Sequence, residues 1–191
     1  MPPVFQAQRR IMELKSKRLL FREWRETDAE ALYRLARVPE IGDGAGFPPH
    51  KSQEDSLFII RNVLSEPETY AVVNRKTGEI IGSAGLHFSL ENNTAMRAHE
   101  AEIGYWIAKP LWGWGFATEA VETLVRHAKE DLHLVGVWGS VFPSNGASRR
   151  VLEKAGLTFH HAQNILFSQL AREREVLYFY RPLEETPTEE R

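Results

Sequence analysis

A glycine-spaced turn between an apolar strand and an amphipathic helix constrains this chain more than any other feature. The turn and the start of the helix read Leu111-Trp112-Gly113-Trp114-Gly115-Phe116-Ala117-Thr118-Glu119-Ala120. Because this segment has little side-chain bulk at Gly113, Gly115 and Ala117, its backbone N–H groups can approach an anion closely, and the following helix adds the positive end of its dipole. The same Gly-x-Gly pattern also serves tight packing between a strand and a helix. The turn alone therefore leaves two interpretations, a phosphate cradle and a packing turn.

The flanking segments favour the phosphate cradle. Apolar residues recur at helical spacing after the turn, which predicts a helix up to about Asp131 with one face in the core: Ala117, Ala120, Val121, Leu124, Val125 and Ala128. Before the turn, the segment from Ala101 to Ile107 is rich in β-branched and aromatic residues and is followed by Lys109-Pro110, which predicts a strand ended by proline. Strand, glycine turn and helix thus follow one another in the order that a phosphate site needs.

Three motifs taken together closely resemble the GNAT superfamily of acyl-CoA-dependent N-acetyltransferases. They are Ile103-Gly104-Tyr105-Trp106-Ile107, then residues 112–120 of the turn, and then Asn145-Gly146-Ala147-Ser148-Arg149-Arg150-Val151-Leu152-Glu153-Lys154-Ala155-Gly156-Leu157. The opening Lys17-Arg18-Leu19-Leu20-Phe21-Arg22-Glu23-Trp24, followed by Thr27-Asp28-Ala29-Glu30-Ala31-Leu32, resembles the RimJ/RimL branch, which is named for acetylating ribosomal protein N-termini. The resemblance extends from about Glu13 to about Leu183, in the family's order of elements.

The expected fold is a single GNAT-like α/β domain of the mixed α+β type. We expect residues 1–12 to be an N-terminal extension, 13–183 the domain and 184–191 a disordered tail. The expected sheet is mostly antiparallel and seven-stranded, with strands at 18–24, 70–74, 79–87, 101–107, 135–142, 158–167 and 175–182. Helices are expected on both faces: one after a capping box at Thr27 to Glu30, one begun by Ser52, the helix after the glycine turn, and a short one from Gly146 to Ala155. Residues 42–50 are expected to form a loop, and the resemblance implies a splayed acyl-CoA cleft between the two central strands.

Composition narrows the class of protein. The chain has 191 residues, a formal net charge of −2 and no cysteine. The absence of cysteine excludes disulfides, a thiol nucleophile and the usual zinc sites, and we expect no metal site. The small net charge gives no electrostatic case for nucleic acid or membrane binding. No long apolar run suggests a secretory signal or a membrane span, so we expect a soluble cytoplasmic protein, either a monomer or a homodimer.

The resemblance implies that acetyl-CoA is the acyl donor. Pyrophosphate would bind the backbone amides of Gly113 to Thr118, and the pantetheine arm would pair with the preceding strand as an added strand does. The candidate donor-binding residues are Tyr105, Trp106, Ile107, Trp112, Gly113, Trp114, Gly115, Phe116, Ala117, Thr118, Asn145 and Ser148. Two positions depart from the family pattern, because Trp112 stands where Gln or Arg is frequent and Trp114 where a cation is frequent. Asn145 is also a good helix N-cap, and Trp112 can equally be a packing residue.

Acetyl transfer to an amine requires a base for the ammonium, a hydrogen-bond donor for the oxyanion and, optionally, an acid for the thiolate. A backbone N–H of the 105–107 strand would stabilise the oxyanion. One GNAT branch uses a tyrosine acid and a glutamate base, whose positions align here with Leu152 and Ser140, so that pair is absent. The resemblance to RimL-type enzymes implies Ser148 as the acid. Glu102 is the candidate base, acting directly or through water, because a carboxylate on a central strand must be paired, solvated or functional. His87 and His99 are alternative bases, although a lone histidine at a strand end is more often a surface residue.

The sequence leaves the acceptor and one alternative function open. The acceptor is an amine, either a peptide N-terminus or a small molecule, and neither can be chosen from loops whose shape is unknown. A CoA-binding sensor without catalysis is the alternative, because the sequence pattern by itself does not assign the base. A nucleotide site is excluded, because no Lys-Ser/Thr follows the turn and the third glycine of the dinucleotide fingerprint is missing.

Overall fold

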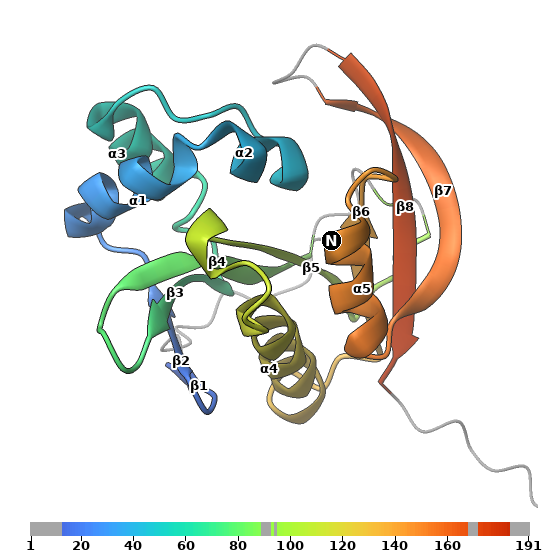
Figure 1. Ribbon diagram of the computed structural model, residues 1–191. Helices are drawn as coiled ribbons and strands as arrows, with labels where there is room; N and C mark the ends of the chain where they lie inside the picture. The colour runs from blue at the N-terminus through green and yellow to red at the C-terminus, as the bar shows by residue number, and fades with distance from the viewer. Residues whose placement is uncertain (1–12, 89–92, 94, 168–171, 184–191) are drawn as a thin grey trace, which may run out of the picture.

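A sheet of eight strands in the order β1-β2-β3-β4-β5-β6-β8-β7 runs through the computed structural model (Figure 1). The structure describes residues 13–88, 93, 95–167 and 172–183. The strands within them are β1 (Leu14–Lys15), β2 (Leu19–Glu23), β3 (Thr69–Asn74), β4 (Ile80–His87), β5 (Glu100–Ile107), β6 (Gly136–Val141), β7 (Thr158–Phe167) and β8 (Arg172–Pro182). The expectations for residues 1–12 and 184–191 lie outside the described residues.

The sheet is mostly antiparallel, as predicted, but the expected number of seven strands is wrong. Each strand pairs antiparallel with its neighbours except β5 and β6, which are parallel. The additional strand is β1, where Leu14 pairs with Phe21 and Lys15 with Leu20. Two residues are too short to display the two-residue alternation from which a strand is predicted.

Helices cover both faces of the sheet, which confirms the expected layers. They are α1 (Ala29–Ala36), α2 (Pro39–Ala45), α3 (Gln53–Asn62), α4 (Phe116–Glu130) and α5 (Gly146–Lys154), with short 3-10 turns η1 (Glu26–Asp28) and η2 (Lys109–Leu111). In Figure 1, α1, α2 and α3 lie above the sheet, and α4 lies below it. Buried residues of α4 and α5 join the main core cluster, while α1 and α3 close a second cluster around Trp24 and Ala71.

Two local predictions near the N-terminus are wrong. Residues 42–45 of the expected loop 42–50 instead form the end of α2, which has Pro39 in its first turn and Gly46 as a left-handed C-cap at φ 81°, and only residues 46–50 lie outside the helix. Its Ile41 is buried, so tertiary packing outweighs the poor helix propensity of two glycines. The predicted capping box is also replaced, because the chain enters α1 through η1 and the Asp28 carboxylate binds Arg22 and the Arg25 N–H instead.

Other local predictions are confirmed. Ser52 caps α3 by accepting a hydrogen bond from the Asp55 N–H at 3.1 Å. The hairpin between β3 and β4 turns at Gly78, whose φ of 74° is left-handed. The helix predicted to end near Asp131 is α4, with Asp131 as its C-cap. Each of these features depends on residues close together in the chain, which is why the pattern predicts them.

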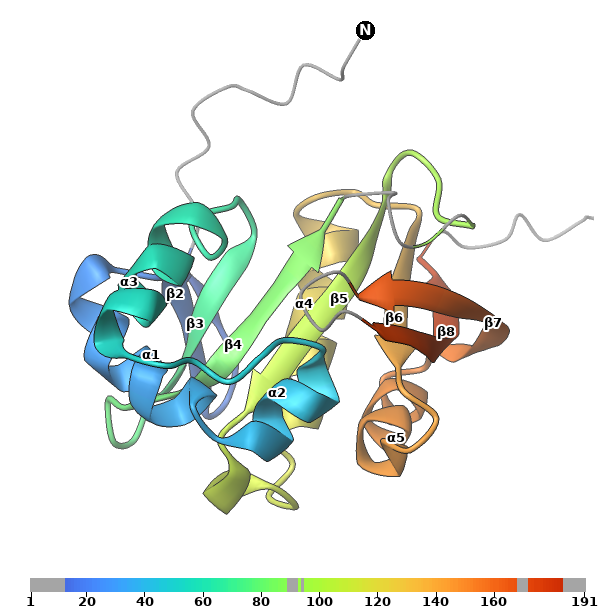
Figure 2. The same ribbon diagram turned by 90° about the horizontal axis from the view of Figure 1, so that it is seen from above.

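The two central strands separate part-way along their length. β5 and β6 are paired only from Glu100 with Gly136 to Ile103 with Gly139. β5 continues to Ile107 on its pairing with β4, so its other edge has no strand partner beyond Ile103 among the described residues. Figure 2 shows α2 lying over β5 on this side of the sheet. The expected splayed cleft therefore opens at Gly104, below α2.

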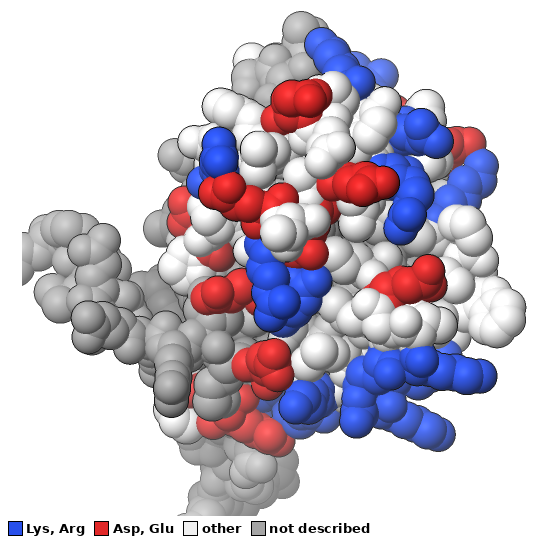
Figure 3. Space-filling model, turned by 90° about the vertical axis from the view of Figure 1, so that its left-hand side faces the viewer, with Lys and Arg blue, Asp and Glu red and all other residues white. Residues whose placement is uncertain are grey.

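The outer surface carries both signs of charge. On the side where α1 and α3 lie, acidic and basic side chains are interspersed (Figure 3). Arg61 of α3 and Glu26 of η1 form one such pair at 2.7 Å. No helix in the described part of the chain is both long enough and apolar enough to cross a membrane.

Candidate active site

The glycine turn forms an open concave backbone at the start of α4. Gly113 and Gly115 adopt left-handed φ angles of 82° and 79°, which side chains other than glycine rarely adopt. A Cβ at Gly113 would meet no protein atom within 4 Å, so the space in front of this backbone is free. Gly115 is the N-cap of α4, and the helix dipole therefore points its positive end into the same space. The turn fits a bound phosphate group.

Arg18 and Glu119 brace this turn from the side of β2. Glu119 Oε1 accepts hydrogen bonds from Ser16 Oγ and the Arg18 N–H, both at 2.7 Å, and Oε2 accepts from Arg18 Nε at 2.6 Å. The Arg18 guanidinium also donates to the Trp114 carbonyl at 3.0 Å and lies over the Phe116 ring. Burial alone would raise the pKa of Glu119, but these hydrogen bonds outweigh it and lower the pKa. The bracing therefore fixes the backbone of the cradle.

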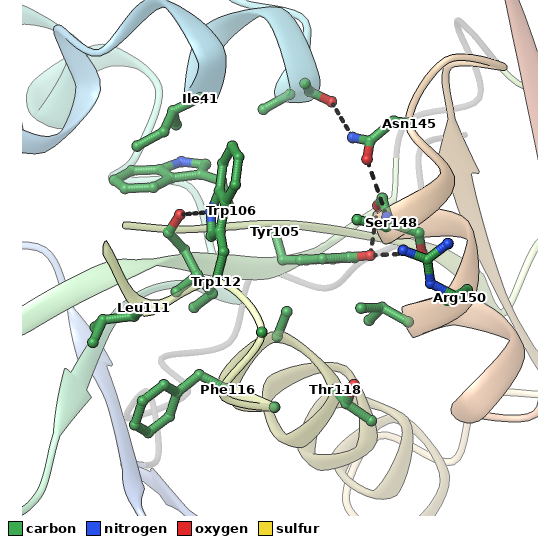
Figure 4. A pocket seen from close by; sticks show the side chains of 18 of the residues that line it. Ile41, Tyr105, Trp106, Leu111, Trp112, Phe116, Thr118, Asn145, Ser148 and Arg150 are labelled. Carbon is green, nitrogen blue, oxygen red and sulfur yellow. Dashed lines mark hydrogen bonds between the residues drawn. The ribbon is translucent and has the colours of Figure 1, made fainter. Parts of the chain in front are cut away.

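A cavity of about 290 Å³ runs from the cradle to the splayed edge of β5 (Figure 4). Its lining includes all but one of the predicted donor-binding residues. The lining residues are Glu40, Ile41, Gly44, Ala45, Tyr105, Trp106, Ile107, Leu111, Trp112, Gly113, Gly115, Phe116, Ala117, Thr118, Asn145, Ala147, Ser148, Arg150, Val151 and Lys154. Trp114 is missing from this lining and is 67% exposed, so its side chain points away from the cavity.

Two cations that the sequence analysis missed face the cradle from α5. Arg150 and Lys154 line the cavity together with Ala147 and Val151, at the i, i+3, i+4, i+7 spacing of one helix face. The family pattern places a cation at the position of Trp114, inside the turn. Here the positive charge lies on α5, across the cavity from the turn. The spacing of Arg150 and Lys154 on one helix face with Ala147 would have predicted their place from the sequence.

Trp112 and Asn145 have structural roles beside their place in the lining. The Trp112 indole N–H donates to the Ile107 carbonyl at 2.7 Å, which holds the turn against the end of β5 although half of the side chain is exposed. Asn145 Oδ1 accepts from the Ser148 N–H at 3.1 Å, which confirms the predicted cap of α5. Its amide nitrogen lies 3.5 Å from the Gly44 carbonyl of α2. These contacts close the cavity between α2 and α5.

A second cavity of about 520 Å³ adjoins the first one at the point where β5 separates from β6. Five of its lining residues also line the first cavity: Gly44, Ala45, Tyr105, Trp106 and Ser148. The rest of its wall mixes apolar and polar side chains. The larger apolar ones include Phe47, Leu64, Ile103, Phe142, Ile165, Phe167 and Val176, and the polar ones are Thr69, Ser83, His87, Glu102, Ser140 and Tyr178. The two cavities therefore meet where β5 separates from β6.

Glu102 is the carboxylate of the second cavity. It is partly buried, and its Oε1 accepts a hydrogen bond from Ser140 Oγ of β6 at 2.5 Å. Burial raises the pKa of Glu102, and the Ser140 hydrogen bond opposes that effect without cancelling it. Glu100, on the same strand face, instead accepts from the Trp138 indole at 2.7 Å and the Tyr180 hydroxyl at 3.0 Å. Of these two, Glu102 alone lines the cavity.

Ser148 lies in the first turn of α5 and meets a side chain from β5. The Tyr105 ring points across the cavity to α5 (Figure 4), and its hydroxyl lies 2.6 Å from Ser148 Oγ. Burial raises the pKa of Tyr105 to about 12, although the Ser148 hydrogen bond acts in the opposite direction. The phenol is therefore protonated at neutral pH.

The two histidine alternatives are separated by the fold. His87 lines the second cavity and is the register partner of Glu102, and its Nε2 would lie 2.7 Å from a Cβ on Gly104. Burial lowers the pKa of His87, so its ring is neutral at pH 7. His99 precedes the first residue of β5, at the opposite end from the cleft, and lines neither cavity. Of the two alternative bases, only His87 lies at the cleft, and the prediction of His99 as a possible base is wrong.

The arrangement brings together what acyl transfer to an amine needs. A turn that fits an anion and an open strand edge lie on one side of the junction, and a cavity whose described lining holds one carboxylate lies on the other. A hydroxyl pair from β5 and α5 lies between them. The two cavities, which share Tyr105, Trp106 and Ser148, leave room for an extended thioester in the first and an amine in the second.

Comparison with known proteins agrees with this geometry. Residues 18–158 match the family model described as an acetyltransferase (GNAT) domain. An uncharacterized N-acetyltransferase of Bacillus subtilis, YoaA, is 30% identical over 148 residues, covering 75% of this chain and 81% of that protein.

Solved structures share the fold. The crystal structure of a GNAT-family acetyltransferase from Bacillus anthracis superposes with a TM-score of 0.77 at 20% identity, over 91% of this chain and all of that one. RimL, a ribosomal L7/L12 alpha-N-protein acetyltransferase solved with coenzyme A, superposes with a TM-score of 0.70 at 19% identity, over 88% and 96% of the two chains.

Proposed function

The chain belongs to the GNAT family of acetyltransferases, and from that premise we propose that it moves an acetyl group from acetyl-CoA to a primary amine by direct attack. The observation that carries the proposal is the junction of the two cavities at Tyr105, Trp106 and Ser148. Donor and acceptor enter from opposite sides and meet in one ternary complex, so no acyl-enzyme is needed. The absence of cysteine from the sequence agrees with direct transfer.

The first cavity holds the acyl donor. Backbone N–H groups of the turn from Gly113 to Thr118 bind the pyrophosphate, helped by the α4 dipole and by the facing cations Arg150 and Lys154. The unpaired edge of β5 beyond Ile103 receives the amides of the pantetheine arm as a neighbouring strand would. A backbone N–H on the same edge stabilises the oxyanion as the amine attacks.

Glu102 prepares the amine. Its raised pKa suits a general base better than an ordinary carboxylate does, because proton transfer is most efficient when the pKa of the base approaches the working pH. Ser140 orients the Glu102 carboxylate by its hydrogen bond. In another branch of the family, the position of Ser140 holds the glutamate base itself. Ser148 donates to the departing sulfur.

The acceptor is proposed to be a protein N-terminus. The second cavity offers one carboxylate, Glu102, among apolar and neutral polar side chains, which suits one amine followed by uncharged chain better than a compound with several positive charges. RimL, which shares the fold, is described as acetylating a protein α-amine. A small monoamine is the second candidate, because the cavity of about 520 Å³ is large enough for one.

The test is thiol release from acetyl-CoA with a panel of peptide N-termini, monoamines, amino acids, polyamines and aminoglycosides. In the enzyme, Glu102→Gln lowers kcat by about 10² or more, because general base catalysis contributes 10²–10⁴. The rate of the wild type rises with pH through the raised pKa of Glu102, since only the deprotonated carboxylate accepts a proton, and this rise is lost in Glu102→Gln.

His87→Gln is the matched comparison, because it changes the other basic group of the same cavity. If His87→Gln removes the pH dependence and Glu102→Gln keeps it, the assignment of the base is wrong. If acetyl-CoA binds saturably and no acceptor in an extended panel is acetylated, the protein is a CoA-binding sensor.

A further inference from the structure

The hydroxyl of Tyr105 lies at the junction of the two cavities. The side chain arises on β5, crosses the junction of the two cavities and ends beside the first turn of α5. Its hydroxyl lies 2.6 Å from Ser148 Oγ and 3.2 Å from the Ser148 carbonyl oxygen. Two hydroxyl groups from separate elements thus form one hydrogen-bonded pair.

This pair lies where the chemistry takes place. Among the described residues that line both cavities, Tyr105 and Ser148 are the ones with hydroxyl side chains, the others being Gly44, Ala45 and Trp106. Leu152, at the position where one branch of the family has its tyrosine acid, is fully buried and contributes no polar group. The phenol therefore reaches the junction from β5 rather than from α5.

The acidity of the two groups differs. An alkyl hydroxyl is a far weaker acid than a phenol, whose ordinary pKa of about 10 is raised by burial to about 12 at Tyr105. Burial keeps the Tyr105 phenol protonated across the neutral range, so it is a proton donor and not a base. If Ser148 acted alone, its oxygen would be left as an alkoxide after donating its proton. A phenol at hydrogen-bond distance can supply a new proton to that oxygen.

Resting on the proposed function, we propose that Tyr105 supplies the proton that Ser148 delivers to the departing sulfur. As the tetrahedral species collapses, the bond between carbon and sulfur breaks and its electron pair goes to sulfur. Sulfur takes the Ser148 proton, Ser148 Oγ takes the Tyr105 proton, and the phenolate regains a proton from solvent. The surplus proton on the amine nitrogen leaves through Glu102. Tyr105 acts through Ser148 and is a positioning residue in this relay.

The relay predicts a particular pattern of rates. Tyr105→Phe lowers kcat by about 10- to 100-fold with the dissociation constant for CoA unchanged, because the ring and its packing remain. Ser148→Ala lowers kcat by at least as much. The double variant is no slower than Ser148→Ala, because Tyr105 has no route to sulfur without Ser148. A double variant slowed by the product of the two single effects would show that the hydroxyls act independently and would overturn the relay.

A second measurement needs no acceptor. The chain has no cysteine, so the ultraviolet thiolate absorbance of a complex with CoA reports on the CoA sulfur alone among thiols. A donor aimed at the sulfur lowers the pKa of the bound thiol, and we expect Tyr105→Phe and Ser148→Ala both to raise it. Tyr180→Phe is the control, because it also removes a tyrosine hydroxyl that donates to a protein group, Glu100, away from both cavities.

The two measurements separate the two proposals. If no acceptor is turned over but Tyr105→Phe raises the pKa of the bound CoA thiol and Tyr180→Phe leaves it unchanged, the hydroxyl pair contacts the CoA sulfur but the transferase proposal fails, and the relay, which needs a departing sulfur, fails with it. If Tyr105→Phe leaves both kcat and the pKa of the bound thiol as in the wild type, the relay is overturned while the transferase proposal is unaffected.

Discussion

Gly113→Ala separates the conformational role of the cradle from its binding role. Gly113 has a φ of 82°, and an added Cβ would meet no protein atom within 4 Å. The substitution therefore costs the strain of a left-handed alanine, about 1–2 kcal/mol, and no steric clash. For a chain of this size, 1 kcal/mol corresponds to about 2–4 °C in Tm. The same Cβ projects into the space proposed for the pyrophosphate.

Gly78→Ala is the matched control. Gly78 also has a left-handed φ, of 74°, and its Cβ would also meet nothing within 4 Å, but it lies in the hairpin turn between β3 and β4. Both variants should lose similar stability in thermal unfolding. Only Gly113→Ala should bind CoA more weakly in calorimetry. Loss of one backbone hydrogen bond to a charged phosphate costs about 1.5–3 kcal/mol, which is about 10- to 150-fold in Kd.

Two results would refute this reasoning. Unchanged CoA affinity in Gly113→Ala would mean that phosphate does not approach this backbone. Equal weakening in Gly113→Ala and Gly78→Ala would mean that lost stability, and not the shape of the cradle, governs binding.

Further predictions concern the contacts that hold the site and the core. Glu119→Ala removes three charge-assisted hydrogen bonds, and we expect a loss of about 2–4 kcal/mol in urea unfolding together with weaker CoA binding, the partial exposure of Arg18 limiting the effect. A loss below about 0.5 kcal/mol would show that this bracing is dispensable. Burial lowers the pKa of His127, but its hydrogen bonds to Glu68 and Asp131 outweigh burial and raise the pKa above 6.5. The stability from this group is thus fully present below pH 6.5 and is lost as the pH rises through the folded pKa. Unfolding free energies measured from pH 5 to 9 should fall over that range, and His127→Gln should remove the fall.

Local patterns were enough for the elements around the donor cavity. The start of α4 depends on Gly115 as its N-cap and on apolar residues at helical spacing, both of which lie within one short segment. The same holds for the Asn145 cap of α5 and the Gly78 hairpin. Periodicity did not predict α2, whose glycines argue against a helix and whose formation depends on the burial of Ile41.

The sequence by itself therefore determined the family, the glycine turn before α4 and the place of Glu102 on a central strand, because each is carried by motifs of residues near one another in the chain. Only the tertiary structure decided which side chains contact Glu102, Ser148 and the glycine turn. The Ser140 hydrogen bond to Glu102 joins residues 38 positions apart, the Tyr105 contact with Ser148 spans 43, and the Arg18 contact with Glu119 spans 101. No local propensity specifies such contacts, because they form only when the sheet brings separate strands and helices into one cleft.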